Sequence, residues 1–254
     1  MKTRHPRSMT GKVFEGISFK KYARKFLIKT LANFLILYSV YMIVWVFYEP
    51  ALAETRYWYD QLRGKTYVVV EPAQFKTTEP PPQRGLLTDI LEGQTVEKLS
   101  PVDPQFSLMI PKLAANTRVI ENVNSADEKA YLDALRYGVA HAAGTGLPGS
   151  GRHIYLFAHS TNTFANVSRY NAVFYLLYKL EAGDEVDIFY RGQRYTYTVT
   201  GKLIVSPTDV SYMTRQTNGE FLTLQTCWPP GTIAQRLLVF AEPAGQSGEK
   251  LSLR

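Results

Sequence analysis

The longest uncharged run in the chain covers residues 30–48, where most side chains are apolar. As a helix at ~1.5 Å per residue, this run would measure about 28 Å, close to the ~30 Å hydrocarbon core of a membrane. The pattern predicts a transmembrane helix at 30–48. A cleaved signal peptide is the alternative, because Ala51-Leu52-Ala53 has the form of a cleavage site. The run exceeds the usual apolar core of such a peptide, which favours the anchor.

The distribution of charge predicts the orientation of this helix in the membrane. Residues 1–29 contain nine Lys or Arg and one acidic residue, a net +8, which leaves 20 basic and 21 acidic residues, a net −1, for the rest. Basic residues beside a span stay on the cytoplasmic side. We therefore predict a cytoplasmic leader at 1–29, a cell-membrane location and an extracellular remainder. Since the excess charge belongs to one end, the net charge of +7 does not indicate nucleic-acid binding.

The next part of the chain, residues 49–105, is predicted to be an extracellular stalk. A short helix fits residues 51–65, and a brief strand or extended connector fits residues 67–70. Prolines at positions 80–82, 101 and 104 indicate an extended, polyproline-like spacer at 71–105. Such a spacer would hold a folded domain away from the membrane.

From residue 106 the apolar residues fall into short runs with turn signals between them. Strands fit 106–110, 117–123, 152–158, 185–190, 195–199, 203–205, 221–226 and 236–240. Short helices fit 127–138 and 164–180. Many short strands at close spacing predict a mostly β domain at 106–243, folded as a closed or nearly closed β-barrel with short helices. Residues 244–254 are predicted to be a C-terminal tail.

The only cysteine, Cys227, lies between two of these strand-like runs. The loop that follows it, residues 228–232, contains two prolines and a glycine and cannot continue a strand pairing. If the flanking runs pair as antiparallel neighbours, Arg236 returns beside Cys227. A lone cysteine is more often a small buried apolar residue than a nucleophile. A thiol next to a stiff loop and a cation indicates instead a positioned, reactive group.

A histidine is the natural partner for such a thiol, because an imidazolium lowers a thiol pKa and can donate a proton. His159 follows an apolar strand and is the best candidate; His141 fits a structural or rim role, and His153 alternates out of phase. The four histidines are dispersed, and the oxygen-bearing residues near 121–127 are typical of a solvated loop. We predict neither a metal site nor a cofactor.

Three motifs carry a family resemblance: Thr223-Leu224-Gln225-Thr226-Cys227 with Arg236 after it, Ile110-Pro111-Lys112-Leu113, and Leu156-Phe157-Ala158-His159-Ser160. Together they resemble the sortases, membrane-anchored cysteine transpeptidases of the bacterial cell surface. The run from Thr226 to Thr232 is similar to classes D and E. The resemblance implies that Cys227 is the nucleophile and His159 the general acid and base. It also implies that Arg236 stabilises the oxyanion and substrate, and that Thr226 helps to bind substrate.

The resemblance also implies a reaction and its partners. A sortase cleaves a C-terminal sorting signal of LPxTG or LAxTG type between Thr and Gly and transfers the acyl group to an amine on a peptidoglycan precursor or a pilin. Two alternatives stay open. The chain could be a cysteine endopeptidase in which water resolves the intermediate, or a catalytically silent surface-binding module with the same barrel. Residue identity does not separate transfer from hydrolysis, whereas the joint presence of Cys227, His159 and Arg236 speaks against the silent module.

Overall fold

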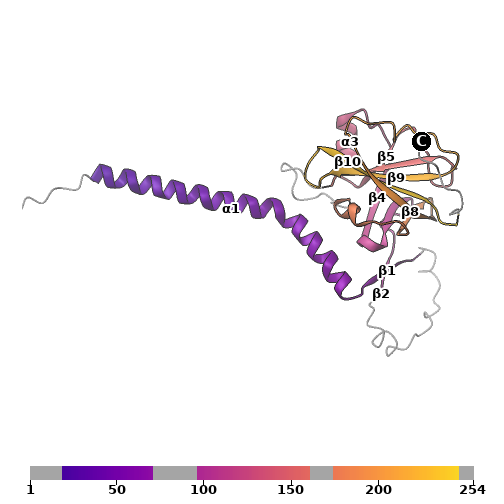
Figure 1. The fold of residues 1–254 in the computed structure, drawn as a ribbon, viewed down its shortest axis with the longest axis horizontal. Helices are drawn as coiled ribbons and strands as arrows, with labels where there is room; N and C mark the ends of the chain where they lie inside the picture. The colour runs from indigo at the N-terminus through magenta and orange to yellow at the C-terminus, as the bar shows by residue number, and fades with distance from the viewer. Residues whose placement is uncertain (1–18, 71–95, 161–173, 246–254) are drawn as a thin grey trace, which may run out of the picture. The chain divides into compact units, whose positions relative to one another are not determined.

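The computed structural model describes residues 19–70, 96–160 and 174–245 (Figure 1). The chain divides into two compact units, Met1–Glu49 and Pro50–Arg254, and each is described by itself. Residues 71–95 of the predicted 71–105 spacer, most of the predicted helix at 164–180 and the end of the tail lie outside the described residues.

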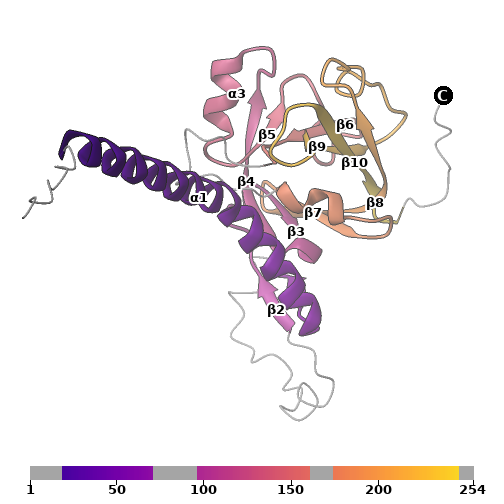
Figure 2. The ribbon, with the colours of Figure 1, turned by 60° about the vertical axis from the view of Figure 1, so that its left-hand side comes forward.

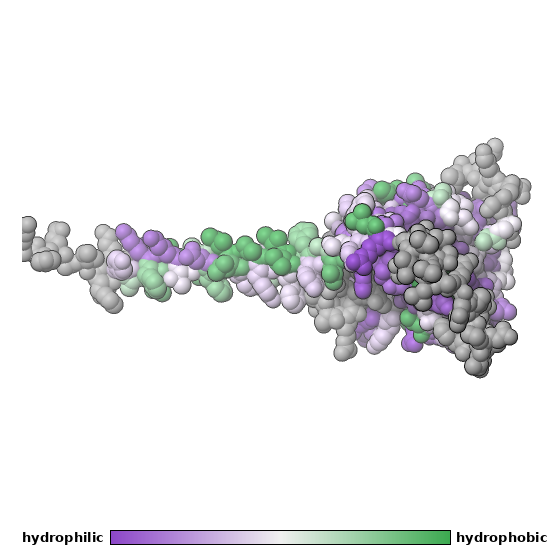
Figure 3. All heavy atoms as spheres, turned by 90° about the horizontal axis from the view of Figure 1, so that it is seen from below, coloured by the Kyte–Doolittle hydropathy of each residue, from purple (hydrophilic) through white to green (hydrophobic). Residues whose placement is uncertain are grey.

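The described part of the first unit is helical. It belongs to α1, Phe19–Leu62, which contains Pro50. Apolar side chains of this stretch, among them Leu31, Ile36 and Val44, are exposed, as the green spheres along the helix in Figure 3 show. One segment, Tyr22–Trp45, is long and apolar enough to cross a membrane. It begins earlier than the predicted span at 30–48, because the helix extends into the basic leader, and it ends at Trp45.

In the second unit, eight strands close into a barrel with the order β10-β8-β7-β3-β4-β5-β6-β9 (Figures 1 and 2). The predicted closed, mostly β fold is confirmed. The strands are β3 Phe106–Ile110, β4 Ala115–Val123, β5 Val139–Ala142, β6 His153–Phe157, β7 Glu185–Tyr190, β8 Gln193–Val205, β9 Phe221–Trp228 and β10 Gln235–Pro243. Short helices connect them: η2 Pro111–Leu113, α3 Glu128–Ala134 and η3 Tyr175–Lys179.

Local sequence explains the connections. The carboxylate of Asp127 caps α3 by accepting a hydrogen bond from the backbone N–H of Ala130 at 3.1 Å. The β7–β8 hairpin turns at Arg191 and Gly192, whose φ angles are 50° and 80°; positive φ at both central residues suits a tight two-residue hairpin turn. The predicted 164–180 helix is, over its described end, the 3₁₀ helix η3.

Inside the barrel, alternate residues of neighbouring strands form one apolar core. On β9 these are Leu222 and Leu224, and on β10 Leu237 and Val239; each is at most 3% exposed. Burying a side chain of this size stabilises the fold by about 1.5–3 kcal/mol. The core therefore anchors the strands that carry the candidate site, and both of their faces are covered, since Phe221 and Leu238 on the other face are buried too.

Between α1 and β3 the structure differs from the predicted spacer. Strand β1, Thr66–Val69, pairs in parallel with β2, Val96–Leu99, which lies within the residues expected to be extended. Val69 packs with Met109 and Phe189 of the barrel, both fully buried. The described ends of the stalk are thus part of the folded domain.

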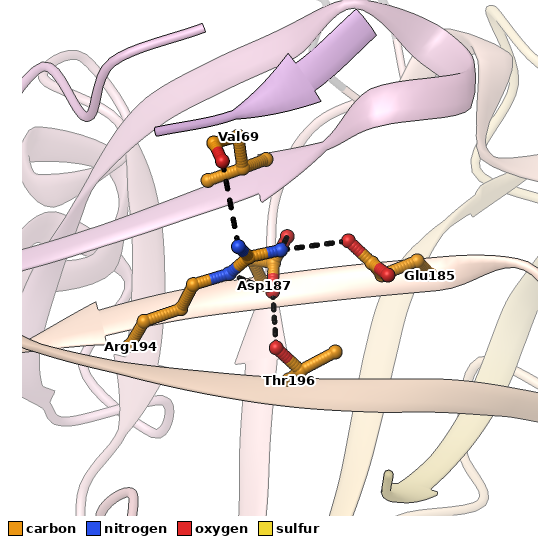
Figure 4. Close-up of polar contacts among 5 residues, drawn as sticks. All are labelled: Val69, Glu185, Asp187, Arg194 and Thr196. Carbon is orange, nitrogen blue, oxygen red and sulfur yellow. Dashed lines mark hydrogen bonds and ion pairs between the residues drawn. The ribbon is translucent and has the colours of Figure 1, made fainter. Parts of the chain in front are cut away.

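A buried ion pair also holds β1 (Figure 4). The guanidinium of Arg194 donates to both carboxylate oxygens of Asp187 at 2.8 and 2.9 Å and to the Val69 carbonyl at 3.4 Å. Thr196 donates to the same carboxylate at 2.7 Å, and Glu185 accepts from Arg194 at 2.9 Å. Asp187 is fully buried, so its charge depends on these partners.

Candidate active site

Cys227 lies near the end of β9, a strand hydrogen-bonded to β10 on one side and β6 on the other (Figure 2). On the β10 side, Arg236 is the residue directly opposite Cys227 in the antiparallel ladder. Opposed residues in a sheet share a face, with Cα atoms about 4.5–5.5 Å apart. The sequence expectation that Arg236 returns beside Cys227 is confirmed.

On the other side, β6 runs parallel to β9, with Phe157 opposite Gln225. The ladder continues beyond the end of β6, because the backbone N–H of Ala158 donates to the Gln225 carbonyl at 3.1 Å. His159 follows two residues after the end of β6, at the same end of the sheet as Cys227 on β9. Cys227 and Arg236 are therefore paired neighbours, and His159 directly follows the strand that pairs with β9 on its other side.

The site occupies one face of these strands. Below Cys227 on that face, the hydroxyl of Tyr155 donates to the side-chain carbonyl of Gln225 at 2.5 Å. Tyr155 is only 2% exposed. Burial raises its pKa, and the nearby charge of Arg236 opposes that shift. The hydrogen-bonded pair of Tyr155 and Gln225 thus lies on this face of the sheet, two residues before Cys227 along β9.

Thr226 points to the opposite face, because successive side chains of a strand alternate. Its side chain is 2% exposed, and its hydroxyl donates to the carbonyl of Ala158 at 3.1 Å. The sequence suggested a substrate contact for Thr226. In the structure its hydroxyl joins β9 to the residue before His159, and the substrate contact stays a prediction.

Burial acts in opposite directions on the two candidate reactive groups, both of which are half-buried. It raises the pKa of the Cys227 thiol, and the positive charge of Arg236 partly offsets that shift. It lowers the pKa of the His159 imidazole. Each group is therefore pushed toward its neutral form. Arg236 is the charge that favours the thiolate.

The guanidinium of Arg236 is held by its own loop. Its Nη1 donates to the carbonyls of Ile233 and Gln235, at 3.2 and 3.1 Å. No hydrogen bond from Nε or Nη2 reaches another residue in the described part of the chain. An arginine fork can use one nitrogen as an anchor and present the others to an anion. This arrangement suits an oxyanion or a peptide carbonyl next to Cys227.

Two aromatic neighbours of the site were not found from sequence. Tyr131 of α3 packs edge-on against Phe157, with ring centroids 6.4 Å apart. Burial and then the charge of Glu128 raise its pKa, and the charge of Arg236 opposes this shift. Trp228, directly after Cys227, packs against Tyr178 of η3 at 5.6 Å. Neither contact leaves a pattern in the sequence, because the partners come from separate elements.

The other described histidines have different partners. The backbone N–H of Asn122 donates to Nδ1 of His141 at 3.2 Å, and Nε2 of His141 lies 2.8 Å from the Gly146 carbonyl, which fits the structural role expected. His153 contacts the hydroxyl of Thr223 at 2.8 Å, and burial lowers its pKa to about 4. Within the described ranges, no group of three or more His, Cys, Asp or Glu side chains is arranged to hold a metal.

Comparison with known proteins now decides the family. The model of the sortase domain matches residues 108–244, which is just over half of the 254 residues. The chain belongs to the sortase family. The resemblance found from the three motifs is confirmed.

Individual proteins that are similar to this chain are sortases too. A curated relative, Sortase D of Bacillus subtilis (strain 168), is 24% identical over 183 residues, or 70% of this sortase and 84% of the relative. Sortase C-1 from Actinomyces oris is 29% identical, with a TM-score of 0.45 over 56% of this chain and 75% of that one. A Clostridium perfringens Sortase D5 transpeptidase is 23% identical, with a TM-score of 0.45 over 62% and 86%. Family membership rests on the sequence match and not on these superpositions.

Proposed function

We propose that this sortase is a cysteine transpeptidase in which Cys227 is the nucleophile, His159 the general acid and base, and Arg236 the donor to substrate and oxyanion. The observation that best supports the proposal is the pairing of Arg236 with Cys227, on a strand whose other neighbour, β6, leads directly into His159. A thiol, an imidazole and a forked cation are the groups that acyl transfer through a thioester requires.

The first half-reaction forms the acyl-enzyme. The Cys227 thiolate attacks the Thr carbonyl carbon of an LPxTG or LAxTG sorting signal, and the carbonyl oxygen becomes an oxyanion next to Arg236. When the Thr–Gly bond breaks, the glycine nitrogen takes a proton from the His159 imidazolium and leaves as an amine. The sulfur keeps the acyl group as a thioester.

The second half-reaction returns the enzyme to its starting state. An acceptor amine, on a peptidoglycan precursor or a pilin, attacks the thioester carbon, and His159 takes the proton that this nitrogen loses. The new amide bond forms as the carbon–sulfur bond breaks. Thr226 acts as a positioning residue in this scheme, since its hydroxyl holds the carbonyl of Ala158 and hence the chain at His159.

Location and subclass belong to the same proposal. The apolar segment Tyr22–Trp45, after a basic leader, supports a single-pass anchor with its N-terminus in the cytoplasm and the barrel outside. The Bacillus subtilis relative and the run from Thr226 to Thr232 support a class D-like sortase. Protease added to intact protoplasts should then remove the barrel and spare the leader; protection of the barrel would contradict this topology.

The function is tested by incubating the full chain, in detergent micelles, with LPxTG and LAxTG peptides, with and without an oligoglycine amine. We expect a ligated product with the amine and none with Cys227→Ala. Hydrolysis that an added amine never diverts would favour the endopeptidase alternative. A wild-type thiol that forms no acyl adduct with either peptide would favour the silent binding module.

A further inference from the structure

The residue after the candidate nucleophile is connected to the end of α1 through η3. The Trp228 ring packs against the Tyr178 ring, with centroids 5.6 Å apart and planes inclined by 55°. The hydroxyl of Tyr178 donates a short hydrogen bond to Glu54, which belongs to the part of α1 in the second unit. Burial and this hydrogen bond raise the pKa of Tyr178, so the hydroxyl stays protonated and remains a donor at neutral pH.

Lys179 of η3 adds further contacts between η3 and the end of α1. Its ammonium lies 3.2 Å from Glu54 and 5.3, 5.2 and 4.9 Å from the ring centroids of Tyr57, Trp58 and Tyr178. The side chains of Lys179 and Glu54 are 19% and 25% exposed, so water only partly screens their attraction. A cation among three rings and a carboxylate is held more firmly than an isolated surface ion pair. We call Glu54, Tyr57, Trp58, Tyr178 and Lys179 the α1–η3 clamp.

The barrel fixes the other side of η3. The ammonium of Lys202 on β8 donates to the Tyr178 carbonyl at 2.7 Å, and Leu177 is fully buried in the core. Tyr178 therefore has little freedom to move away from Trp228 while the clamp is intact. Trp228 itself is half-buried and packs against the same core.

We propose that Glu54 and Lys179 are positioning residues for Cys227, acting through Tyr178 and Trp228. Trp228 is the last residue of β9, so a shift of its ring changes the end of the strand at which Cys227 lies opposite Arg236. The helical segment between the apolar span and the barrel thus contributes to turnover as well as attachment. The effect on turnover rests on the proposed transpeptidase function, whereas the effect on the thiol does not.

The variants Glu54→Ala and Lys179→Met, made in the full chain in detergent micelles, test this proposal. Partial misplacement of a reacting group lowers the rate without weakening remote substrate contacts, so we expect kcat to fall about 5- to 20-fold while KM stays within about twofold. Lys179→Arg keeps a cation among the rings and should restore most of the rate. Glu97→Gln is the matched control, because it removes another carboxylate–lysine pair, that with Lys65 at 2.5 Å, which does not involve Trp228.

A second measurement needs no substrate. Since Cys227 is the only cysteine, iodoacetamide reports on it alone, and we expect its alkylation rate to change by about threefold or more in both variants, because thiol reactivity follows its surroundings. Circular dichroism and the unfolding temperature identify variants that are folded at the assay temperature. If the wild type cleaves no sorting peptide, the proposed function fails, and the alkylation rates still decide the positioning role. Folded variants that match Glu97→Gln in alkylation overturn the proposal, even where kcat falls.

Discussion

Replacing Arg236 by lysine separates the shape of this side chain from its charge. Arginine anchors one nitrogen on the carbonyls of Ile233 and Gln235 and keeps the rest of its fork for an anion beside Cys227. Lysine has a single nitrogen, so its ammonium cannot hold the loop and reach the oxyanion from two directions. Arg236→Lys keeps the positive charge, but the side chain can then either bind the loop carbonyls or donate to the oxyanion, and not both.

The expected fall in kcat follows from the loss of one hydrogen-bond donor to the oxyanion. Removing one well-placed oxyanion donor typically costs about 10²–10³ in turnover, or about 2.7–4 kcal/mol of transition-state stabilisation. Because the lysine charge still attracts the oxyanion, we expect the lower end, a loss of about 100-fold in kcat. The alkylation rate of Cys227 should change by less than about tenfold, since the cation that favours the thiolate remains. Arg236→Ala should lose at least as much activity as Arg236→Lys.

The assay is steady-state transfer of a sorting peptide to an oligoglycine amine, with unfolding temperatures measured alongside. Arg191→Lys is the control, because Arg191 lies in the exposed β7–β8 turn, with its guanidinium over the Tyr190 ring at 5.0 Å. This change should leave transfer nearly unaltered. The bidentate role of Arg236 is refuted if Arg236→Lys retains more than about a third of wild-type kcat, a loss far below that of an oxyanion donor.

Three further predictions follow from burial and hydrogen bonding. The proposed active state holds one proton between Cys227 and His159, so kcat/KM should have a bell-shaped dependence on pH. Activity should be lost as pH falls through a His159 pKa below 6.5 and as pH rises through a Cys227 pKa above 9.0. An acid limb above pH 6.5 would contradict the effect of burial on His159. Arg194→Met leaves the buried carboxylate of Asp187 without its guanidinium; breaking such a pair costs about 3–5 kcal/mol, and calorimetry should show a Tm lower by roughly 6–20 °C, whereas an unchanged Tm would count against the ion pair. Thr226→Val removes the hydroxyl that joins β9 to Ala158, directly after β6, and should lower kcat with KM unchanged. A raised KM with unchanged kcat would instead support the substrate contact expected from sequence.

Much of the barrel could be predicted because its strands are short, apolar and separated by clear turns. The pairing of Arg236 with Cys227 followed from two runs joined by a loop that cannot continue either strand. His159 was different, since an apolar strand ending in histidine has no unique partner. The family motif predicted it, and the parallel pairing of β6 with β9 shows that the strand preceding His159 is the neighbour of the strand that carries Cys227.

The stalk contains a strand pairing that a local sequence pattern cannot predict. Strand β2, Val96–Leu99, has two charged residues among four, is largely exposed and pairs with β1, about thirty positions earlier in the chain. Nothing in its own sequence indicates a strand. The α1–η3 clamp is similar, because its rings come from elements more than a hundred residues apart. Such contacts depend on the folded barrel and become visible only with it.

The environment of the candidate pair has a consequence for catalysis. Burial favours the neutral thiol and the neutral imidazole, so the reactive ion pair is a minority of the resting enzyme if the proposed roles hold. Arg236 is the group that opposes this preference at the thiol. A bound peptide would displace water from the site and strengthen the attraction between Arg236 and a thiolate, because Coulomb energies rise as the local dielectric constant falls. The same peptide would increase the burial of both groups. Activation on binding therefore requires that the attraction between Arg236 and the thiolate increase more than the desolvation penalty.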